Sequence, residues 1–179
     1  VYGGLVNKRI VAMLQAAGVN ALGLTGADMN VIRSRRRAPK QVKDAATGAV
    51  QTVDYGYVGD IDSADGDRLA QLMQAGVTPV LAPLSHDGQG NMLNVNADTI
   101  AATTAKALAA HYDVTLTSCF EKAGVMLDPD NDASAIEKLN RKDFERLASD
   151  GTIQGGMIPK IENAFDAIDH GVRRVVITS

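Results

Sequence analysis

The stretch Asn94-Val95-Asn96-Ala97-Asp98 stands between an apolar, strand-like run with a glycine-rich turn and a long helical pattern. A second helix start, Gly155-Gly156-Met157-Ile158-Pro159-Lys160, follows later in the chain. Amides and a carboxylate at the first start suit a polar acceptor, whereas backbone N–H groups and a lysine at the second suit a phosphate. Together the two helix starts predict a phosphoryl-transfer site.

Strand-like and helix-like patterns alternate on both sides of these segments. Short apolar runs predict strands, and apolar residues at helical spacing predict helices. Strands are expected at residues 21–24, 77–83, 114–117 and 175–177, and helices at 5–14, 97–111 and from 158 onwards. This alternation is typical of an α/β fold with a largely parallel sheet sandwiched by helices.

Other segments give more local expectations. Residues 31–51 are polar, basic and interrupted by Pro39 and Gly48, which predicts a long loop or exposed hairpin with little contribution to the core. Residues 54–61 alternate as a strand does, and Ser63 is expected to cap the helix that follows. Asn140 with Asp143 resembles a capping arrangement for a helix that ends near residue 149.

Composition narrows the class of protein. The 179 residues, 45% of them hydrophobic, suffice for one domain with a sizeable core, and a net charge of -3 favours neither nucleic acid nor an anionic membrane. The single cysteine, Cys119, excludes an internal disulfide framework, and no apolar run approaches the roughly 20 residues of a membrane span. We therefore expect a cytoplasmic protein, and the apolar run directly before the last residue suggests a piece of a longer chain.

The polar residues of the first helix start have two interpretations. Asn94 and Asn96 are good helix caps, and Asp98 in a first turn complements the helix dipole. One cap needs only one such residue, so three polar side chains leave hydrogen-bonding capacity for a ligand.

Lys160 is by itself typical of a solvated surface lysine, but it follows Gly155-Gly156, which allows a phosphate to approach the backbone closely. The segment is no Walker A loop, because Met157 stands where that motif requires lysine. The three histidines and Cys119 lack metal-site spacing, so no metal ligands are predicted. A basic cluster lies at Arg33, Arg35, Arg36, Arg37, Lys40 and Lys43. It is more typical of a solvated hairpin than of a nucleic-acid site.

Several motifs, spread over essentially the whole chain, resemble those of the amino-acid kinase family. They are Asn7-Lys8, Leu22-Gly23-Leu24-Thr25-Gly26-Ala27-Asp28, Tyr57-Val58-Gly59-Asp60-Ile61, Pro79-Val80-Leu81-Ala82-Pro83, Asn94 to Asp98 and Gly155 to Lys160. The pairing of Asn-x-Asn-Ala-Asp with a later Gly-Met-x-x-Lys helix is the most specific of these features.

The resemblance implies a role for individual residues. Asn94 matches the residue that binds the acyl-amino-acid substrate, and Asn96 lies beside it. Asp98 matches the aspartate that organises the catalytic lysines, and Lys160 the lysine that stabilises the transferring phosphoryl group. The implied nucleotide-binding residues are Ser118, Cys119, Thr152, Ile153, Gln154 and Met157. Cys119 stands where the family usually has aspartate.

By the same resemblance, the chain is one truncated α/β kinase domain, with the acyl-amino-acid side at about residues 1–111 and the nucleotide side at 112–179. The implied reaction is the transfer of a phosphoryl group from ATP, bound with Mg²⁺, to the side-chain carboxylate of an N-acylglutamate in arginine biosynthesis, by a homo-oligomer. The family's N-terminal lysine, glycine-rich loop and substrate-binding arginine have no counterpart here. Two alternatives stay open: a kinase for another small acid, and a non-catalytic binding or oligomerisation module.

Overall fold

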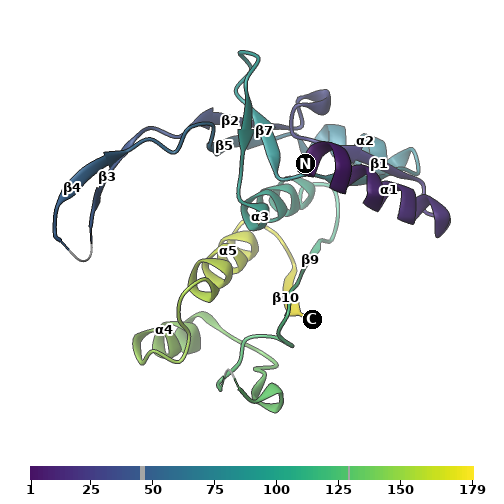
Figure 1. Ribbon diagram of the computed structural model, residues 1–179. Helices are drawn as coiled ribbons and strands as arrows, with labels where there is room; N and C mark the ends of the chain where they lie inside the picture. The colour runs from purple at the N-terminus through teal and green to yellow at the C-terminus, as the bar shows by residue number, and fades with distance from the viewer. Residues whose placement is uncertain (45–46, 129) are drawn as a thin grey trace. The chain divides into compact units, whose positions relative to one another are not determined.

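The computed structural model describes residues 1–44, 47–128 and 130–179, which form two compact units, Val1–Ile100 and Ala101–Ser179 (Figure 1). Each unit has its own helices and its own parallel strand pair. The assignment of an acyl-amino-acid side and a nucleotide side divided near residue 111 remains a prediction.

The first unit begins with helices packed on a parallel strand pair. Its elements are a π-helical turn Tyr2–Val6, α1 Asn7–Ala16, β1 Ala21–Leu24, α2 Gly66–Gln74 and β6 Thr78–Leu81. Strands β1 and β6 pair in parallel from Ala21↔Thr78 to Leu24↔Leu81. Both strands lie within segments that the sequence predicts to be strands.

Side-chain hydrogen bonds attach α1 to this strand pair. The buried Asn7 donates its Nδ2 hydrogen to the Val80 carbonyl at 2.8 Å, and Lys8 Nζ donates to the Gly23 carbonyl at 2.9 Å. A β-carbon on Gly23 would overlap the Asn7 side chain. These motif residues therefore have a structural role in the fold.

Four further strands of the first unit form a mixed sheet, in the order β5-β2-β7-β8. Its strands are β2 Ile32–Arg36, β5 Gly59–Ala64, β7 Leu84–His86 and β8 Met92–Asn94. Val31 and Ile32 are fully buried, so the expectation of little core contribution from residues 31–51 is wrong at its start. Alternation explains this result, because Ile32 and Ser34 point inward while Arg33 and Arg35 point outward.

The remaining part of that segment is the exposed hairpin that the sequence predicts, formed by β3 Lys40–Lys43 and β4 Val50–Val53. Residues 45 and 46, within the predicted segment, lie outside the described residues. At the hairpin's base Arg36 pairs with Asp54 at 2.8 Å and Arg37 with Asp60 at 2.6 Å. Arg36 and Arg37 of the basic cluster are thus paired within the chain.

Two local expectations about the following segment are wrong. The strand begins at Gly59 rather than at residue 54, and Ser63 lies inside it. The cap of α2 is Asp65, whose carboxylate accepts a hydrogen bond from Arg68 N at 2.9 Å. Both Ser63 and Asp65 are good capping residues, and the continuation of strand pairing with β2 through Ala64 selects the second.

The second unit contains a parallel strand pair and helices. Its elements are α3 Ala97–Leu108, which enters from the first unit, β9 Thr115–Cys119, a 3₁₀ turn Asp132–Ser134, α4 Arg141–Ser149, α5 Met157–Asp169 and β10 Arg174–Thr178. Asn140 caps α4 as predicted, accepting from Asp143 N at 2.9 Å. The predicted α/β class with parallel strands is confirmed.

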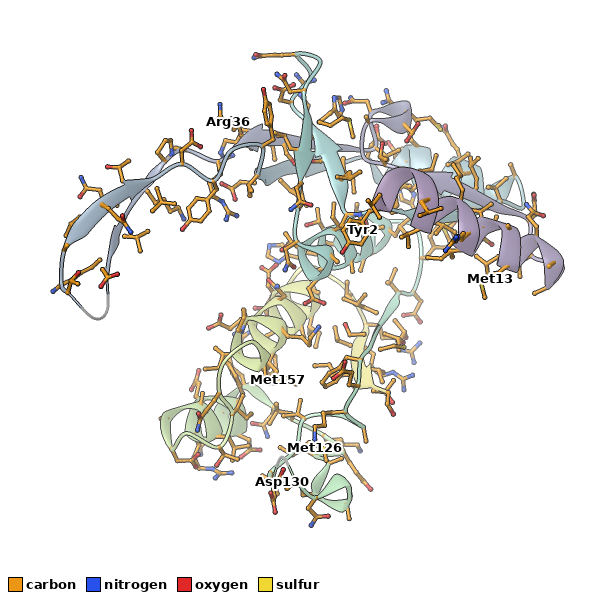
Figure 2. The ribbon with its side chains drawn as sticks, in the orientation of Figure 1. Tyr2, Met13, Arg36, Met126, Asp130 and Met157 are labelled. Carbon is orange, nitrogen blue, oxygen red and sulfur yellow. The ribbon has the colours of Figure 1, made fainter. Side chains whose placement is uncertain are left out.

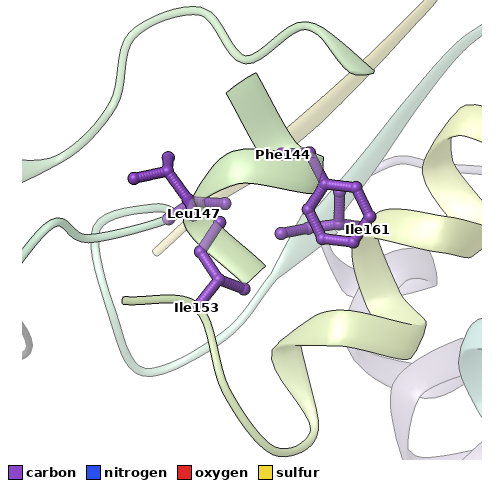
Figure 3. Packing of buried hydrophobic residues seen from close by; sticks show 5 residues of the cluster. Phe144, Leu147, Ile153 and Ile161 are labelled. Atoms are coloured by element: carbon purple, nitrogen blue, oxygen red, sulfur yellow. The ribbon is translucent and has the colours of Figure 1, made fainter. Parts of the chain in front are cut away.

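One core cluster of the second unit lies between α4, α5 and the loop that joins them (Figure 3). Phe144 and Leu147 of α4 pack with Ile153 of the loop and Ile161 of α5. This packing fixes the loop that precedes α5.

Among the described residues, no helix has the length and apolar character needed to cross a bilayer.

The loop after β1 carries local backbone strain. Asp28 accepts hydrogen bonds from Thr25 N at 2.6 Å and from Thr25 Oγ1 at 2.8 Å. Burial acts to raise the pKa of Asp28, but these hydrogen bonds lower it below its ordinary value. Met29 and Asn30 then have φ of 52° and 54°, in the left-handed region that costs a side-chain-bearing residue energy.

We expect Met29→Gly to stabilise the chain by about 0.5–1 kcal/mol, because glycine adopts positive φ without steric cost. Met13, also exposed, lies in the helical conformation of α1, so Met13→Gly is the matched control and should destabilise by about 1 kcal/mol. Urea denaturation of both variants measures the difference. Equal destabilisation by the two substitutions would contradict this account of the loop.

Candidate functional site

Asn94 lies at the end of β8 with its side chain directed away from the core. Its neighbours Leu93 and Val95 are 0% and 4% exposed, and its backbone N–H donates to the Tyr57 carbonyl at 2.8 Å. The exposed Asn94 amide forms no hydrogen bond with any residue that the structure describes. Both its donor and its acceptor are thus available to a ligand.

Asn96 has a structural task. Its Oδ1 accepts a hydrogen bond from Thr99 N at 3.1 Å, at the start of α3. This contact is the capping interaction that the sequence offered as one interpretation. A substrate-binding role for Asn96 stays a prediction, and it would fall to the Nδ2 group. Asp98 is half-buried in the first turn of α3, and its role in organising the catalytic lysines stays a prediction.

The second unit contains a cavity of about 480 Å³ between the segments on either side of α4. Its lining residues are Lys122, Gly124, Met126, Leu127, Gly151, Thr152, Ile153, Gln154 and Met157. Met126 and Met157 are labelled in Figure 2. Thr152, Ile153, Gln154 and Met157, four neighbouring residues that are predicted to bind nucleotide, thus line one cavity.

The walls of the cavity combine apolar and polar groups. Met126, Leu127 and Met157 offer soft apolar surface of the kind that covers a planar ring, and Lys122 supplies a cation. Gly151 has a φ of 80°, and Asp150 Oδ1 accepts from Thr152 N at 3.0 Å, so the loop turns sharply at the cavity wall. A ligand with an apolar ring and an anionic group fits this chemistry.

The sequence missed Lys122, Met126 and Leu127 as lining residues. The loop after β9 was expected on the nucleotide side, but which of its side chains face the cavity depends on how it folds back toward residues 151–157. Ser118 and Cys119 are not among the lining residues, and Cys119 is exposed at the end of β9. Nucleotide binding by Ser118 and Cys119 stays a prediction.

Lys160 lies in the first turn of α5 and is half-buried. Its Nζ lies 5.8 Å from the centroid of the Phe120 ring. At the start of α5, fewer backbone N–H groups are available to a phosphate than the glycine-rich sequence predicts. Met157 N and Ile158 N donate to the carbonyls of Gln154 and Gly155, both at 3.3 Å, and Pro159 has no N–H.

Within the described part of the chain, no three or more His, Cys, Asp and Glu side chains gather in a way that could hold a metal ion. Mg²⁺ in phosphoryl-transfer sites is usually held by substrate phosphates and one or two carboxylates. A magnesium ion that arrives with a nucleotide needs no larger cluster.

Comparison with known proteins fits these features. The model of the amino acid kinase family matches residues 1–179, and the chain belongs to this family. It is 62% identical over 178 residues to the acetylglutamate kinase of Bacteroides thetaiotaomicron, and 41% identical over 179 residues to that of Methanopyrus kandleri. These alignments cover 99% and 100% of this chain, but only 65% and 69% of those enzymes.

Solved structures show the same architecture. The crystal structure of smu.665 from Streptococcus mutans UA159 has a TM-score of 0.75 at 30% identity, covering 98% of this chain and 63% of that one. Giardia carbamate kinase has a TM-score of 0.61 at 14% identity, covering 99% of this chain and 63% of that one, which shows likeness of fold alone. The recognition of the family from sequence motifs is confirmed.

We expect Asn96→Ala to destabilise the chain by about 1 kcal/mol, because it removes the cap of α3. Asn96→Asp keeps an acceptor oxygen and should preserve stability. The matched control is Asn94→Ala, which removes an exposed amide and should change the free energy of unfolding by less than about 0.5 kcal/mol. Chemical denaturation compares the three, and an equal loss for Asn94→Ala and Asn96→Ala would contradict the division of roles.

Proposed function

We propose that this chain carries the acceptor-binding and nucleotide-binding parts of a kinase that phosphorylates the side-chain carboxylate of N-acetyl-L-glutamate or another N-acylglutamate. The observation that carries the proposal is the cavity shared by Thr152, Ile153, Gln154 and Met157. The names of the relatives, all acetylglutamate kinases, support the choice of acceptor. The chain spans 65% of the length of the first of them, so the activity belongs to the longer protein.

The charge of the acceptor carboxylate determines which kind of catalysis the reaction needs. A glutamate side chain has an ordinary pKa of about 4.3, so it is already ionised at pH 7 and needs no general base. The carboxylate and the phosphate repel one another, so catalysis comes from positioning and from positive charge. By the family resemblance, Lys160 supplies charge to the transferring phosphoryl group, Asp98 is the aspartate that organises the catalytic lysines, and Asn94 holds the acyl-amino-acid. The product is an acyl phosphate.

ATP is the phosphoryl donor in this proposal. The apolar wall formed by Met126, Leu127 and Met157 accommodates the base, and Lys122 attracts the phosphates. Magnesium, held by the phosphates of the nucleotide, would neutralise part of their charge.

The setting proposed for this enzyme is arginine biosynthesis in the cytoplasm, in a homo-oligomer. Exposed apolar side chains on the first two helical elements support self-association, since they would otherwise face water. Tyr2 and Met13, labelled in Figure 2, are 57% and 72% exposed, and Leu5 and Ile10 are exposed as well.

Lys160→Ala in the complete kinase should lower kcat/KM about 100- to 1000-fold, as expected when a charge that stabilises the transition state is removed. Lys142→Ala, on the exposed side of α4, is the matched control and should keep activity. The assay traps the acyl phosphate made from N-acetylglutamate as a hydroxamate. Full activity of the Lys160 variant would reject its proposed role, and a wild-type kinase without acyl phosphate formation would reject the function.

Lys122→Met should raise the KM for ATP about tenfold and change kcat by less than about twofold, because one charged hydrogen bond to the nucleotide is lost. Lys138→Met is the control, since Lys138 lines a different cavity of the same unit. Initial rates at varied ATP concentration measure both variants. If the KM for ATP rose equally in both, the change would not report on the cavity near Lys122.

A further inference from the structure

Asp150 ends α4 beside the cavity and contacts the loop that lines it. It is the C-cap residue of α4, and its Oδ1 accepts a hydrogen bond from Thr152 N at 3.0 Å. Arg146 Nη1 lies 3.7 Å from the other carboxylate oxygen, Oδ2. The carboxylate is thus held between α4 and Thr152, a residue that lines the cavity.

The stability of α4 does not explain a carboxylate at this position. The carbonyl end of a helix carries partial negative charge, so an aspartate there is electrostatically unfavourable. The pair that Asp150 forms with Arg146 is exposed, and exposed ion pairs contribute little to stability. A role at the cavity explains this aspartate better than a role in the helix.

The hydrogen bonds of Asp150 determine what the Thr152 hydroxyl can offer to a ligand. Hydrogen bonds from the hydroxyl and from the N–H of Thr152 lower the pKa of Asp150 below its ordinary value, so this carboxyl group is ionised at neutral pH. An ionised carboxylate only accepts hydrogen bonds, so the single hydroxyl hydrogen of Thr152 is donated to Asp150. The hydroxyl oxygen can then only accept a hydrogen bond from a ligand.

The backbone beside this hydroxyl offers no donor to a phosphate. Gly151 N and Ile153 N donate to carbonyl groups of α4, at 3.4 and 2.9 Å, and Thr152 N donates to Asp150. Phosphate oxygens bind to donors and cations, whereas the Asp150 carboxylate repels them. This part of the cavity wall therefore suits a neutral group that donates a hydrogen bond.

We propose that Asp150 is a positioning residue that fixes the Thr152 hydroxyl as the acceptor for a hydrogen-bond donor on the nucleoside of the phosphoryl donor. The nucleoside of ATP carries two kinds of neutral donor, the exocyclic amine of adenine and the hydroxyls of ribose. Met126 and Met157 of the same cavity suit the flat base to which these groups belong. The inference rests on the proposed function, because it assigns both residues to nucleotide recognition.

The first test is steady-state kinetics of the complete kinase. Thr152→Val removes the hydroxyl at nearly constant volume, so it should raise the KM for ATP about three- to tenfold and change kcat by less than about twofold. Thr152→Ser keeps the hydroxyl and should keep the KM. Asp150→Asn should also raise the KM, because its amide can donate to the hydroxyl oxygen and occupy the acceptor. In a Thr152→Val background, Asp150→Asn should have no additional effect.

Asp143→Asn is the matched control for Asp150→Asn. Asp143 Oδ1 also lies 3.7 Å from an Arg146 nitrogen, but Asp143 belongs to the first turn of α4. This substitution should leave the KM for ATP within about twofold of wild type, as expected of an exposed ion pair far from the loop. An equal rise of the KM in Asp143→Asn and Asp150→Asn, or an unchanged KM in Thr152→Val, would overturn the proposal.

Nucleotide analogues identify the donor group. Purine riboside triphosphate lacks the exocyclic amine, and 2′-deoxy-ATP and 3′-deoxy-ATP each lack one ribose hydroxyl. Thr152→Val should no longer change the KM for the analogue that lacks the contacted donor. Loss of the effect with purine riboside triphosphate assigns the amine, and its loss with a deoxy analogue assigns the ribose. An effect that persists with all three analogues would overturn the proposal.

A second test needs neither activity nor a phosphate. In an NMR titration of the 179-residue chain with adenosine, Thr152→Val should weaken binding about three- to tenfold. Thr115→Val, at an exposed position of β9 outside the cavity, should not weaken it. Adenosine binding that is absent, or equal in wild type and Thr152→Val, would overturn the inference. Binding that Thr152→Val weakens, in a protein whose complete form makes no acyl phosphate, would keep the nucleoside contact and reject the proposed function.

Discussion

The burial of Leu93 and Val95 on either side of Asn94 is the constraint on which the proposed acceptor side depends. Because side chains alternate along a strand, two inward-facing apolar residues force the Asn94 amide outward. After β8, Asn96 accepts a hydrogen bond from Thr99 N and caps α3. Asp98 therefore lies in the first turn of this helix. One polar segment thus combines a residue free for a ligand with a residue that maintains the helix.

The proposed nucleotide side depends on a different core. Ile153 is 2% exposed and packs on α4 and α5, so the loop through Thr152 and Gln154 has little freedom. This packing gives the cavity its wall before any ligand binds. It also fixes the start of α5, and therefore the base of the Lys160 side chain. The glycines near this helix start contribute mainly to the turn, because the nearby N–H groups bond within it.

Periodicity predicted the elements that bury one clear face, such as β1, β6 and α5. Four of the six residues that the motif resemblance assigns to nucleotide binding line one cavity, and their binding of nucleotide stays a prediction. Sequence patterns gave the wrong residue where two neighbouring residues are both suited to the same structural role. Ser63 and Asp65 are both good caps, and only the pairing of β5 with β2 decides between them. The burial of Ile32 was not predicted, because exposed arginines alternate with the buried residues of β2. The position of Lys122 at the cavity was not predicted either, because it depends on how the loop after β9 folds toward residues 151–157.

The central claim is that residues 101–179 contain the nucleotide site. The most direct measurement is an NMR titration of the 179-residue chain with a non-hydrolysable MgATP analogue, following backbone amide signals. The account predicts saturable shifts at the cavity residues of segments 122–127 and 151–157, with smaller changes elsewhere. Saturable shifts confined to other segments, or no shifts at millimolar analogue, would contradict it.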